Sequence, residues 1–325
     1  MLYLNQTDLQ QCLARDELRQ VMAEALQALS SGTGKSFPRT VVNVAKDGLS
    51  PLGFMPARDH SRDLLGYKVI TVFESNTKLG LNPHQGLVTL LDPRTGIPRA
   101  LLNGNEITAV RTAAVSAVAT MQLSRKDAAT LVLFGAGIQA IEHLKAILNV
   151  RPIQKVHVCC RRQSSFQSFV DAIESLSLSV KYFSDPKQAL RNADIIVTCT
   201  PGHEMLFSIA EVPQGVHINA IGACRPGEQE IEIIDRKNFA IYVDSMQACR
   251  LESEEILQAV NCKKPSDSSI CGELGALLNK EIPGRQNDDQ ITLFKSVGLS
   301  IEDIYAAEYF YQKALALNLG LDILL

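Results

Sequence analysis

Residues 130–140 read TLVLFGAGIQA. An apolar run of strand formers is followed by the tight turn Gly135-Ala136-Gly137, and apolar residues then recur at helical spacing from Ile138 to Leu148. A strand, a GxGxxA turn and a helix form a dinucleotide-binding fingerprint, in which the glycines let the backbone approach a pyrophosphate and the helix N-terminus faces its charge. Such a turn also occurs in other α/β proteins. Here a second strand, Lys155 to Cys160, follows and supplies the βαβ context.

The end of that second strand indicates which dinucleotide to expect. An NAD-specific site usually carries an acid there, which binds the ribose 2′-hydroxyl. This chain instead reads Cys160-Arg161-Arg162-Gln163-Ser164. Two guanidiniums suit a 2′-phosphate, although a solvated basic turn would have the same sequence. We therefore predict NADP(H) as the preferred cofactor, with NAD(H) possible.

Composition excludes several classes of protein. The chain has 325 residues, 46% of them hydrophobic, and a formal net charge of −3 without a basic block, which argues against a nucleic-acid partner. No apolar run is long enough for a membrane span, and the first residues lack the charged region of a signal peptide. The eight cysteines form no CxxC pair and have no histidine at zinc spacing, so we expect no metal site and a reducing, cytoplasmic location.

Strand and helix patterns divide the chain into two kinds of unit. Short strands dominate the N-terminal part and suggest an antiparallel α+β unit; they are expected at 40–44, 66–73, 86–91 and 97–102, with helices at 16–31 and 106–123. From Thr130 strands and helices alternate, which predicts a doubly wound parallel sheet of the Rossmann type. Its strands are expected at 130–134, 155–160, 179–183, 194–199, 216–221, 239–244 and 291–297. Helices are predicted at Cys271–Lys280 and Ile301–Leu317.

Four basic residues before the glycine turn are unusually placed. Lys68 lies inside an apolar strand, where a charge needs a counter-charge or a ligand. Arg39 precedes a strand, Arg111 lies on an Ala-rich helix, and Arg58 is expected in a loop. Each alone is compatible with a solvated surface residue. If three of these cations converge, they suit the carboxylate of an amino or keto acid.

A series of ordered motifs resembles the ornithine cyclodeaminase/mu-crystallin family along essentially the whole chain. The motifs are FPRT (37–40), GYK (66–68), NPHQG (82–86), DPRTG (92–96), RTAA (111–114), GAGIQA (135–140), DIIVTCT (194–200), INAIGA (218–223), VDS (243–245), LFKSVG (293–298) and ED (302–303).

The resemblance implies a homodimer and a set of site residues. Residues 1–120, with a returning C-terminal helix in 299–325, would form the substrate-binding and dimerisation domain, and 121–298 the NAD(P)-binding Rossmann domain. The resemblance places the substrate carboxylate on Arg39, Lys68 and Arg111. It places the cofactor on Thr112, Gly135, Ala136, Gly137, Ile138 and Gln139 (phosphates), Arg161 and Arg162 (2′-phosphate), Thr200 and Ile221 (the path from adenosine to nicotinamide), and Val297 and Gly298 (nicotinamide).

One departure from the family pattern bears on the reaction. Cyclodeaminases carry an Asp that assists deamination and ring closure, whereas residues 221–230 here read IGACRPGEQE and place Cys224 at that position. A thiol, with a reference pKa of about 8.5, replaces a carboxylate poorly at neutral pH. The run is more similar to the mu-crystallin and pyrroline-carboxylate reductase branch of the family.

The expected activity is therefore NAD(P)H-dependent reduction of a cyclic α-imino acid, Δ1-pyrroline-2-carboxylate or Δ1-piperideine-2-carboxylate, to the cyclic L-amino acid. Lys68 or a water would deliver the proton to nitrogen. Two alternatives from the same family are an ornithine cyclodeaminase (a lyase) and an L-amino-acid dehydrogenase. An alternative of another class is a non-catalytic, NADPH-binding, crystallin-like protein.

Overall fold

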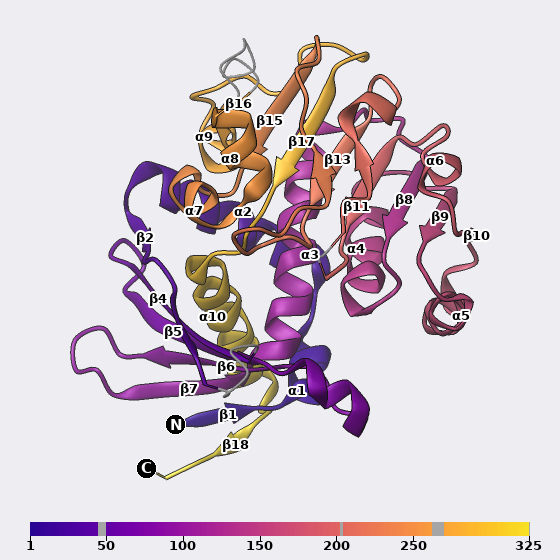
Figure 1. The fold of residues 1–325 in the computed structure, drawn as a ribbon. Coiled ribbons are helices and arrows are strands. Elements are labelled where there is room, and N and C mark those ends of the chain that lie inside the picture. Colours follow the sequence, from indigo (N-terminus) through magenta and orange to yellow (C-terminus); the bar gives the residue numbers. More distant parts are fainter. Residues whose placement is uncertain (45–49, 202–203, 262–269, 325) are drawn as a thin grey trace. The chain divides into compact units, whose positions relative to one another are not determined.

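The computed structural model describes residues 1–325 apart from 45–49, 202–203, 262–269 and 325 (Figure 1). The chain forms two compact units. Unit 1 comprises Met1–Arg111 with Leu299–Leu325, and unit 2 comprises Thr112–Gly298. The boundary falls within the helix α3 (Gly104–Leu123), between Arg111 and Thr112, whereas the sequence suggested a boundary near residue 120.

Unit 1 is built on a sheet with the strand order β18-β1-β7-β6-β5-β4-β2, in which β3 also pairs with β4. The neighbouring strands are antiparallel except for β1 and β7, which are parallel. Their bounds are β1 (Leu2–Leu4), β2 (Gly34–Ser36), β3 (Thr40–Asn43), β4 (Pro51–Asp59), β5 (Leu64–Val72), β6 (His84–Leu91), β7 (Pro98–Asn103) and β18 (Leu321–Asp322). The helices of the unit, besides the first part of α3, are α1 (Gln6–Cys12), α2 (Arg15–Ser31), the 3-10 helix η1 (Glu74–Leu79) and α10 (Ser300–Leu317).

The helix α10 covers one face of this sheet, against β4, β5 and β6 (Figure 1). The alternate residues Leu64, Gly66 and Lys68 of β5 are buried. A Cβ at Gly66 would lie 2.5 Å from the carbonyl oxygen of Thr89 and 3.0 Å from a methyl carbon of Ile304, so only glycine allows α10 to pack this closely. The sheet therefore presents Lys68 toward a helix and not toward solvent.

The elements predicted for unit 1 are found within two residues of their expected ends, but β4 was missed, and so were the shorter elements β1, α1, β2, η1 and β18. Arg58, expected in a loop, lies in this strand. Prolines at positions 51 and 56 and a glycine at 53 hide the strand pattern. Pro56 lies between the two parts of β4 that pair with different strands, because β3 pairs with Pro51–Phe54 and β2 with Ala57–Asp59.

Unit 2 is a doubly wound parallel sheet, as predicted, with the strand order β10-β9-β8-β11-β13-β17-β15-β16. Its strands are β8 (Thr130–Phe134), β9 (Lys155–Cys159), β10 (Ser179–Phe183), β11 (Ile195–Thr198), β13 (His217–Ala220), β15 (Phe239–Val243), β16 (Ile270–Glu273) and β17 (Ile291–Lys295), and a separate pair is formed by β12 (Phe207–Ser208) and β14 (Ile231–Glu232). The strand order reverses between β8 and β11. In such sheets a ligand binds outside the carboxyl ends of the strands at this switch point.

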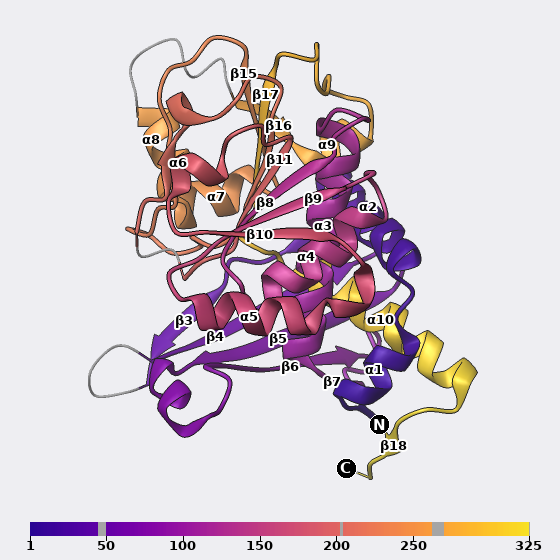
Figure 2. The ribbon, with the colours of Figure 1, turned by 90° about the vertical axis from the view of Figure 1, so that its right-hand side faces the viewer.

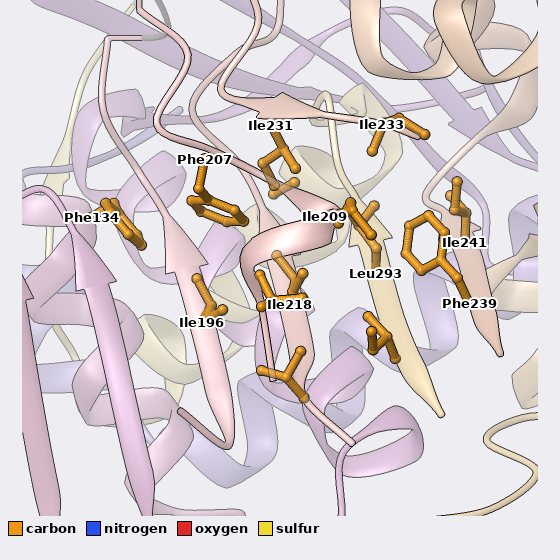
Figure 3. Close-up of a cluster of buried hydrophobic side chains, with 14 of the residues drawn as sticks. Phe134, Ile196, Phe207, Ile209, Ile218, Ile231, Ile233, Phe239, Ile241 and Leu293 are labelled. Carbon is orange, nitrogen blue, oxygen red and sulfur yellow. The ribbon is translucent and has the colours of Figure 1, made fainter. Parts of the chain in front are cut away.

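Both faces of this sheet are covered by apolar side chains. Ile196 of β11 belongs to the cluster in Figure 3, while its neighbours Ile195 and Val197 belong to a second cluster on the opposite face. Such burial on two sides is typical of parallel strands. The helices of the unit, besides the second part of α3, are α4 (Ile138–Leu148), α5 (Gln163–Ala172), η2 (Glu174–Leu176), α6 (Pro186–Ala189), η3 (Ile209–Glu211), α7 (Met246–Glu252), α8 (Glu254–Asn261) and α9 (Leu274–Leu278). Figure 2 shows α4 on one side of the strands and α7 and α8 on the other.

The helix predicted over Cys271–Lys280 is wrong in its first part. Residues Ile270–Glu273 form β16 at the sheet edge, and only Leu274–Leu278 are helical. Gly272 has a φ of +140°, which a right-handed helix does not allow, and the pairing of β16 with β15 shifts register at this point. The adjoining residues 262–269 belong to the stretch 262–289, which the sequence predicts to be loop-rich and polar around that helix, and they lie outside the described part of the chain.

Candidate active site

The glycine turn after β8 is shaped by close backbone contacts. Gly135 has a φ of +112° and donates its N–H to the carbonyl of Cys159 at 2.9 Å. A Cβ at this position would lie 2.9 Å from the carbonyl oxygen of Cys199. By contrast, a Cβ at Gly137 would meet no atom within 4 Å. The first glycine is thus required by the fold, whereas the second leaves open space in front of the turn.

The N-terminus of α4 lies beside that space. Gly137 is its N-cap residue and, within the described structure, no side chain caps the first turn. Ile138 is 58% exposed, and the side-chain oxygen of Gln139 is buried without a hydrogen-bond partner among the described residues. Uncapped amides and an open backbone cradle fit the phosphates of a dinucleotide.

The two arginines lie just beyond the carboxyl end of β9, the strand next to β8. Arg162 is the N-cap residue of α5, and both side chains are exposed. Arg161 Nη1 lies 4.0 Å from Glu204 Oε1, and this carboxylate is itself 73% exposed. Positive charge therefore stands at the strand end where NAD-specific sites usually carry an acid.

The remaining cofactor candidates of unit 2 follow other strands of the same sheet edge or lie on α3. Thr200 follows β11, Ile221 follows β13, and Thr112 is buried on α3. The N–H groups of Val297 and Gly298, which follow β17, both donate to Asp244 Oδ2, at 2.7 and 2.9 Å.

Cys224 lies half-buried in the loop after β13. The preceding residue, Ala223, accepts a hydrogen bond from the buried ammonium of Lys295 through its carbonyl. The backbone beside Cys224 is thus held, and its side chain packs against the hydrophobic cluster of Figure 3.

Unit 1 holds a buried group of opposite charges. Lys68 Nζ lies 2.7 Å from Asp303 Oδ2 and donates to Thr108 Oγ1 at 3.4 Å. Arg111 donates from Nε to Asp303 Oδ1 at 2.9 Å and from Nη1 to Glu302 Oε2 at 2.7 Å. Lys68 and Arg111 are 2% and 4% exposed, and both acids are fully buried. Asp303 thus joins two of the three predicted carboxylate-binding cations.

Burial changes the acidity of Lys68. Desolvation is the largest cause and lowers the pKa of its ammonium to about 8, against the opposing pull of Asp303. The positive charges of Arg111 and Arg39 lower this pKa further, so Arg39 acts on the same group through its field. A lysine with such a pKa exchanges a proton near neutrality, which suits an acid–base role.

Sequence reasoning overlooked the acids that organise these cations and loops. Glu302, Asp303 and Asp244 entered only as parts of motifs, and Glu230 and Glu255 were given no role. One signal was available for the first two, because two adjacent acids stand in the first turn of α10 beside the apolar residues Ile301 and Ile304. No sequence signal indicated the role of the others, because they pair with residues that lie far away along the chain. In the described ranges no group of His, Cys, Asp or Glu side chains is arranged to hold a metal ion, and no helix there is both long and apolar enough to cross a membrane.

The doubly wound sheet, its glycine turn and the uncapped helix define a protein of the dinucleotide-binding class. Comparison with known proteins then assigns the family: residues 2–318 match the ornithine cyclodeaminase/mu-crystallin family, and the chain belongs to it.

Three relatives illustrate what the chain is similar to. A Δ1-pyrroline-2-carboxylate reductase of Bacillus cereus is 35% identical over 322 residues, which cover 98% of each chain. The structure of the Thermococcus litoralis Δ1-pyrroline-2-carboxylate reductase in complex with NADH and L-proline has a TM-score of 0.93 and 32% identity, and covers 99% of this chain and 100% of that one. An archaeal alanine dehydrogenase dimer with bound NAD has a TM-score of 0.91 and 29% identity, covering 100% and 99%.

Proposed function

We propose that this protein is an NAD(P)H-dependent oxidoreductase that reduces a cyclic α-imino acid, Δ1-pyrroline-2-carboxylate or Δ1-piperideine-2-carboxylate, to the cyclic L-amino acid. The observation that carries this proposal is the buried pair Lys68 and Arg111, joined by Asp303, in a chain that is similar over 98% of its length to a Δ1-pyrroline-2-carboxylate reductase. The complex of a second such reductase with NADH and L-proline supports the same reaction, since proline is the product of pyrroline-2-carboxylate reduction.

Arg39, Lys68 and Arg111 bind the substrate carboxylate in this proposal. Arg111 presents a planar donor set whose orientation is held by two carboxylates, Glu302 and Asp303. Lys68 is held by Asp303 and Thr108. Because these partners fix the cations before substrate arrives, little ordering cost remains when the carboxylate binds.

Lys68 also delivers the proton that the imine nitrogen takes up. Its pKa of about 8 lies close to neutral pH, so the ammonium is present at neutrality and releases its proton readily. The amine nitrogen gains this proton as the carbon gains hydride, and solvent then reprotonates Lys68. No carboxylate at position 224 is required, which is consistent with Cys224 in place of the cyclodeaminase Asp.

A nicotinamide dinucleotide, when bound, supplies the hydride from C4 of its ring. Thr112, the turn Gly135–Gln139 and the α4 N-terminus hold its phosphates in this proposal, while Thr200, Ile221, Val297 and Gly298 line its path. We propose NADP(H) as the preferred form, with NAD(H) also accepted. Arg161 and Arg162 support this preference, although the two structural relatives contain NADH and NAD.

A second candidate is an L-amino-acid dehydrogenase, favoured by the similarity to an archaeal alanine dehydrogenase. The two reactions differ in their need for ammonia. A reductase consumes a preformed imine, whereas a dehydrogenase working in the reducing direction must first combine a keto acid with ammonia.

We also propose that the protein is a cytoplasmic homodimer. The relative described as a dimer supports the assembly, as does the face of the unit 1 sheet opposite α10. There Val42, Phe54 and Leu87 are 53%, 39% and 44% exposed, and the register places them on the face opposite Lys68. Such a patch of apolar side chains suits a self-complementary interface. Seven cysteines of the described chain are free thiols, which accords with a reducing compartment.

The deciding assay measures oxidation of NADPH by the purified protein with Δ1-pyrroline-2-carboxylate, with and without ammonia, and with NADH in parallel. We expect rapid oxidation that does not depend on ammonia. Activity restricted to a keto acid plus ammonia would identify the dehydrogenase. Conversion of ornithine with cofactor recycling would identify a cyclodeaminase, and tight NADPH binding without turnover on any of these substrates would identify a binding protein.

A further inference from the structure

Glu230 is a fully buried acid at which five hydrogen bonds converge. Its Oε1 accepts from the N–H of Thr200 at 2.9 Å and from the Thr200 hydroxyl at 2.6 Å. Its Oε2 accepts from the hydroxyl of Thr198 at 2.6 Å and from the N–H groups of Gly222 and Ala223 at 2.9 and 3.3 Å. One side chain thus holds the carboxyl end of β11 and the loop after β13.

Other buried charges fix Glu230 in turn. Its backbone N–H donates to Glu255 Oε1 at 3.1 Å, and Glu255 Oε2 lies 3.2 Å from Lys295 Nζ. Lys295 Nζ donates to the carbonyl of Ala223, which brings the chain of contacts back to the loop held by Glu230. Glu230, Glu255 and Lys295 are each 0% exposed. The ring therefore connects the ends of β11, β13 and β17.

The two loops held by Glu230 are packed too closely to adjust independently. A Cβ at Gly222 would lie 2.3 Å from Glu230 Oε1 and 2.4 Å from the carbonyl oxygen of Thr200. Burying a carboxylate is costly unless donors satisfy it, and in the described structure Glu230 is satisfied by hydroxyls and amides without forming an ion pair. An apolar residue would fill the same volume at less cost, but it would not orient five donors.

We propose that Glu230 is a positioning residue of the cofactor site, which holds Thr200 and the loop 221–224 in their binding geometry before the dinucleotide arrives. This inference rests on the cofactor site proposed above, to which Thr200 and Ile221 belong. Glu230 itself need not touch cofactor or substrate. Its effect is to reduce the ordering cost of binding, which appears in the affinity for the dinucleotide.

Glu230→Gln tests this role. Gln retains one acceptor oxygen but turns an NH₂ group toward the donors of one loop, and that loop loses its attachment. We expect the Kd for NADPH, measured by the fluorescence of the bound dinucleotide without any substrate, to rise roughly tenfold, about the effect of leaving one or two buried donors unsatisfied. Amide hydrogen exchange should accelerate around Thr200 and Gly222. The matched control is Glu232→Gln, which removes a neighbouring carboxylate from β14 and should leave both measurements unchanged.

The role in positioning would be overturned by an unchanged Kd, or by exchange that accelerates throughout unit 2, because Glu230 would then only stabilise the fold. If the Glu230→Gln protein does not fold, Thr198→Val removes a single donor, and we expect a Kd rise of roughly twofold to fivefold with local acceleration of exchange. An unchanged Kd in that variant counts equally against the role. Both measurements are made without an imine, so failure of the proposed reductase reaction would show in the activity assay alone.

Discussion

Lys68 illustrates how a single residue acquires its chemistry from its surroundings. In sequence it is a cation within an apolar strand, and burial by α10 both lowers its pKa to about 8 and supplies Asp303 as its partner. Arg111 contacts the same carboxylate, so the side chain of Asp303 holds the two cations at a fixed spacing. A carboxylate ligand would meet groups already oriented by protein atoms.

The pH dependence of the reaction should reflect Lys68. The ammonium is the active form in the proposed mechanism; it is present below the pKa of about 8 and is lost as the pH rises through that value. We expect kcat/KM for the imine to fall above a pH of about 8, since this parameter reports groups of the free enzyme.

The measurement is a pH–rate profile of the wild-type protein and of Lys68→Arg, whose guanidinium keeps its proton. The variant should be slower and should lack this descending limb. A limb that remains at the same pH in Lys68→Arg belongs to the substrate and contradicts the assignment.

At the scale of elements, the strand–turn–helix of 130–148 separates two functions of glycine. Gly135 is needed for the fold because its φ is +112° and its surroundings are tight. Gly137 has a φ of −90°, which other residues adopt, and has nothing within 4 Å of its missing Cβ. A side chain there would meet only what binds in front of α4.

This difference predicts that alanine substitutions at the two glycines affect different properties, the stability of the fold at Gly135 and the affinity for the cofactor at Gly137. Gly135→Ala should lower the free energy of unfolding by about 1–3 kcal/mol, because it combines a left-handed φ with a clash against the Cys199 carbonyl. Gly137→Ala should leave stability within about 0.5 kcal/mol of wild type. It should nevertheless raise the Kd for NADPH roughly tenfold or more, because its methyl group occupies the approach to the pyrophosphate. Urea unfolding and cofactor fluorescence measure the two effects. Wild-type affinity in Gly137→Ala would show that the pyrophosphate does not bind against the backbone at Gly137.

At the scale of the whole molecule, the unit 1 sheet is covered by α10 on one face and carries Val42, Phe54 and Leu87 on the other. A second copy of the chain is the occupant proposed for that face. The proposal places the interface on unit 1 alone and predicts that a charge introduced within it opposes assembly, because an unpaired buried charge is costly.

Leu87→Glu should therefore convert a dimer into a monomer in size-exclusion chromatography with light scattering. Leu251→Glu is the matched control, since Leu251 is 56% exposed on α7 of unit 2 and the substitution should leave the dimer intact. A wild-type protein that elutes as a monomer would refute the homodimer, and a dimer that persists in Leu87→Glu would place its interface elsewhere.

The sequence by itself determined the class of fold and most of the longer elements. The apolar strand before Gly135, the helical spacing after it and the alternation that follows are local patterns, and local patterns suffice where both faces of a strand are buried. The ordered motifs also identified the family and the predicted cations. β4 was not predicted, because its prolines contradict strand propensity. It is a strand only because it lies between β5 on one side and β2 and β3 on the other.

Tertiary structure alone decided the charge pairing: Arg111 meets Asp303 across 192 residues of chain, and Thr198 meets Glu230 across 32. Buried polar groups select partners by proximity in the folded chain, and no spacing in the sequence encodes that proximity.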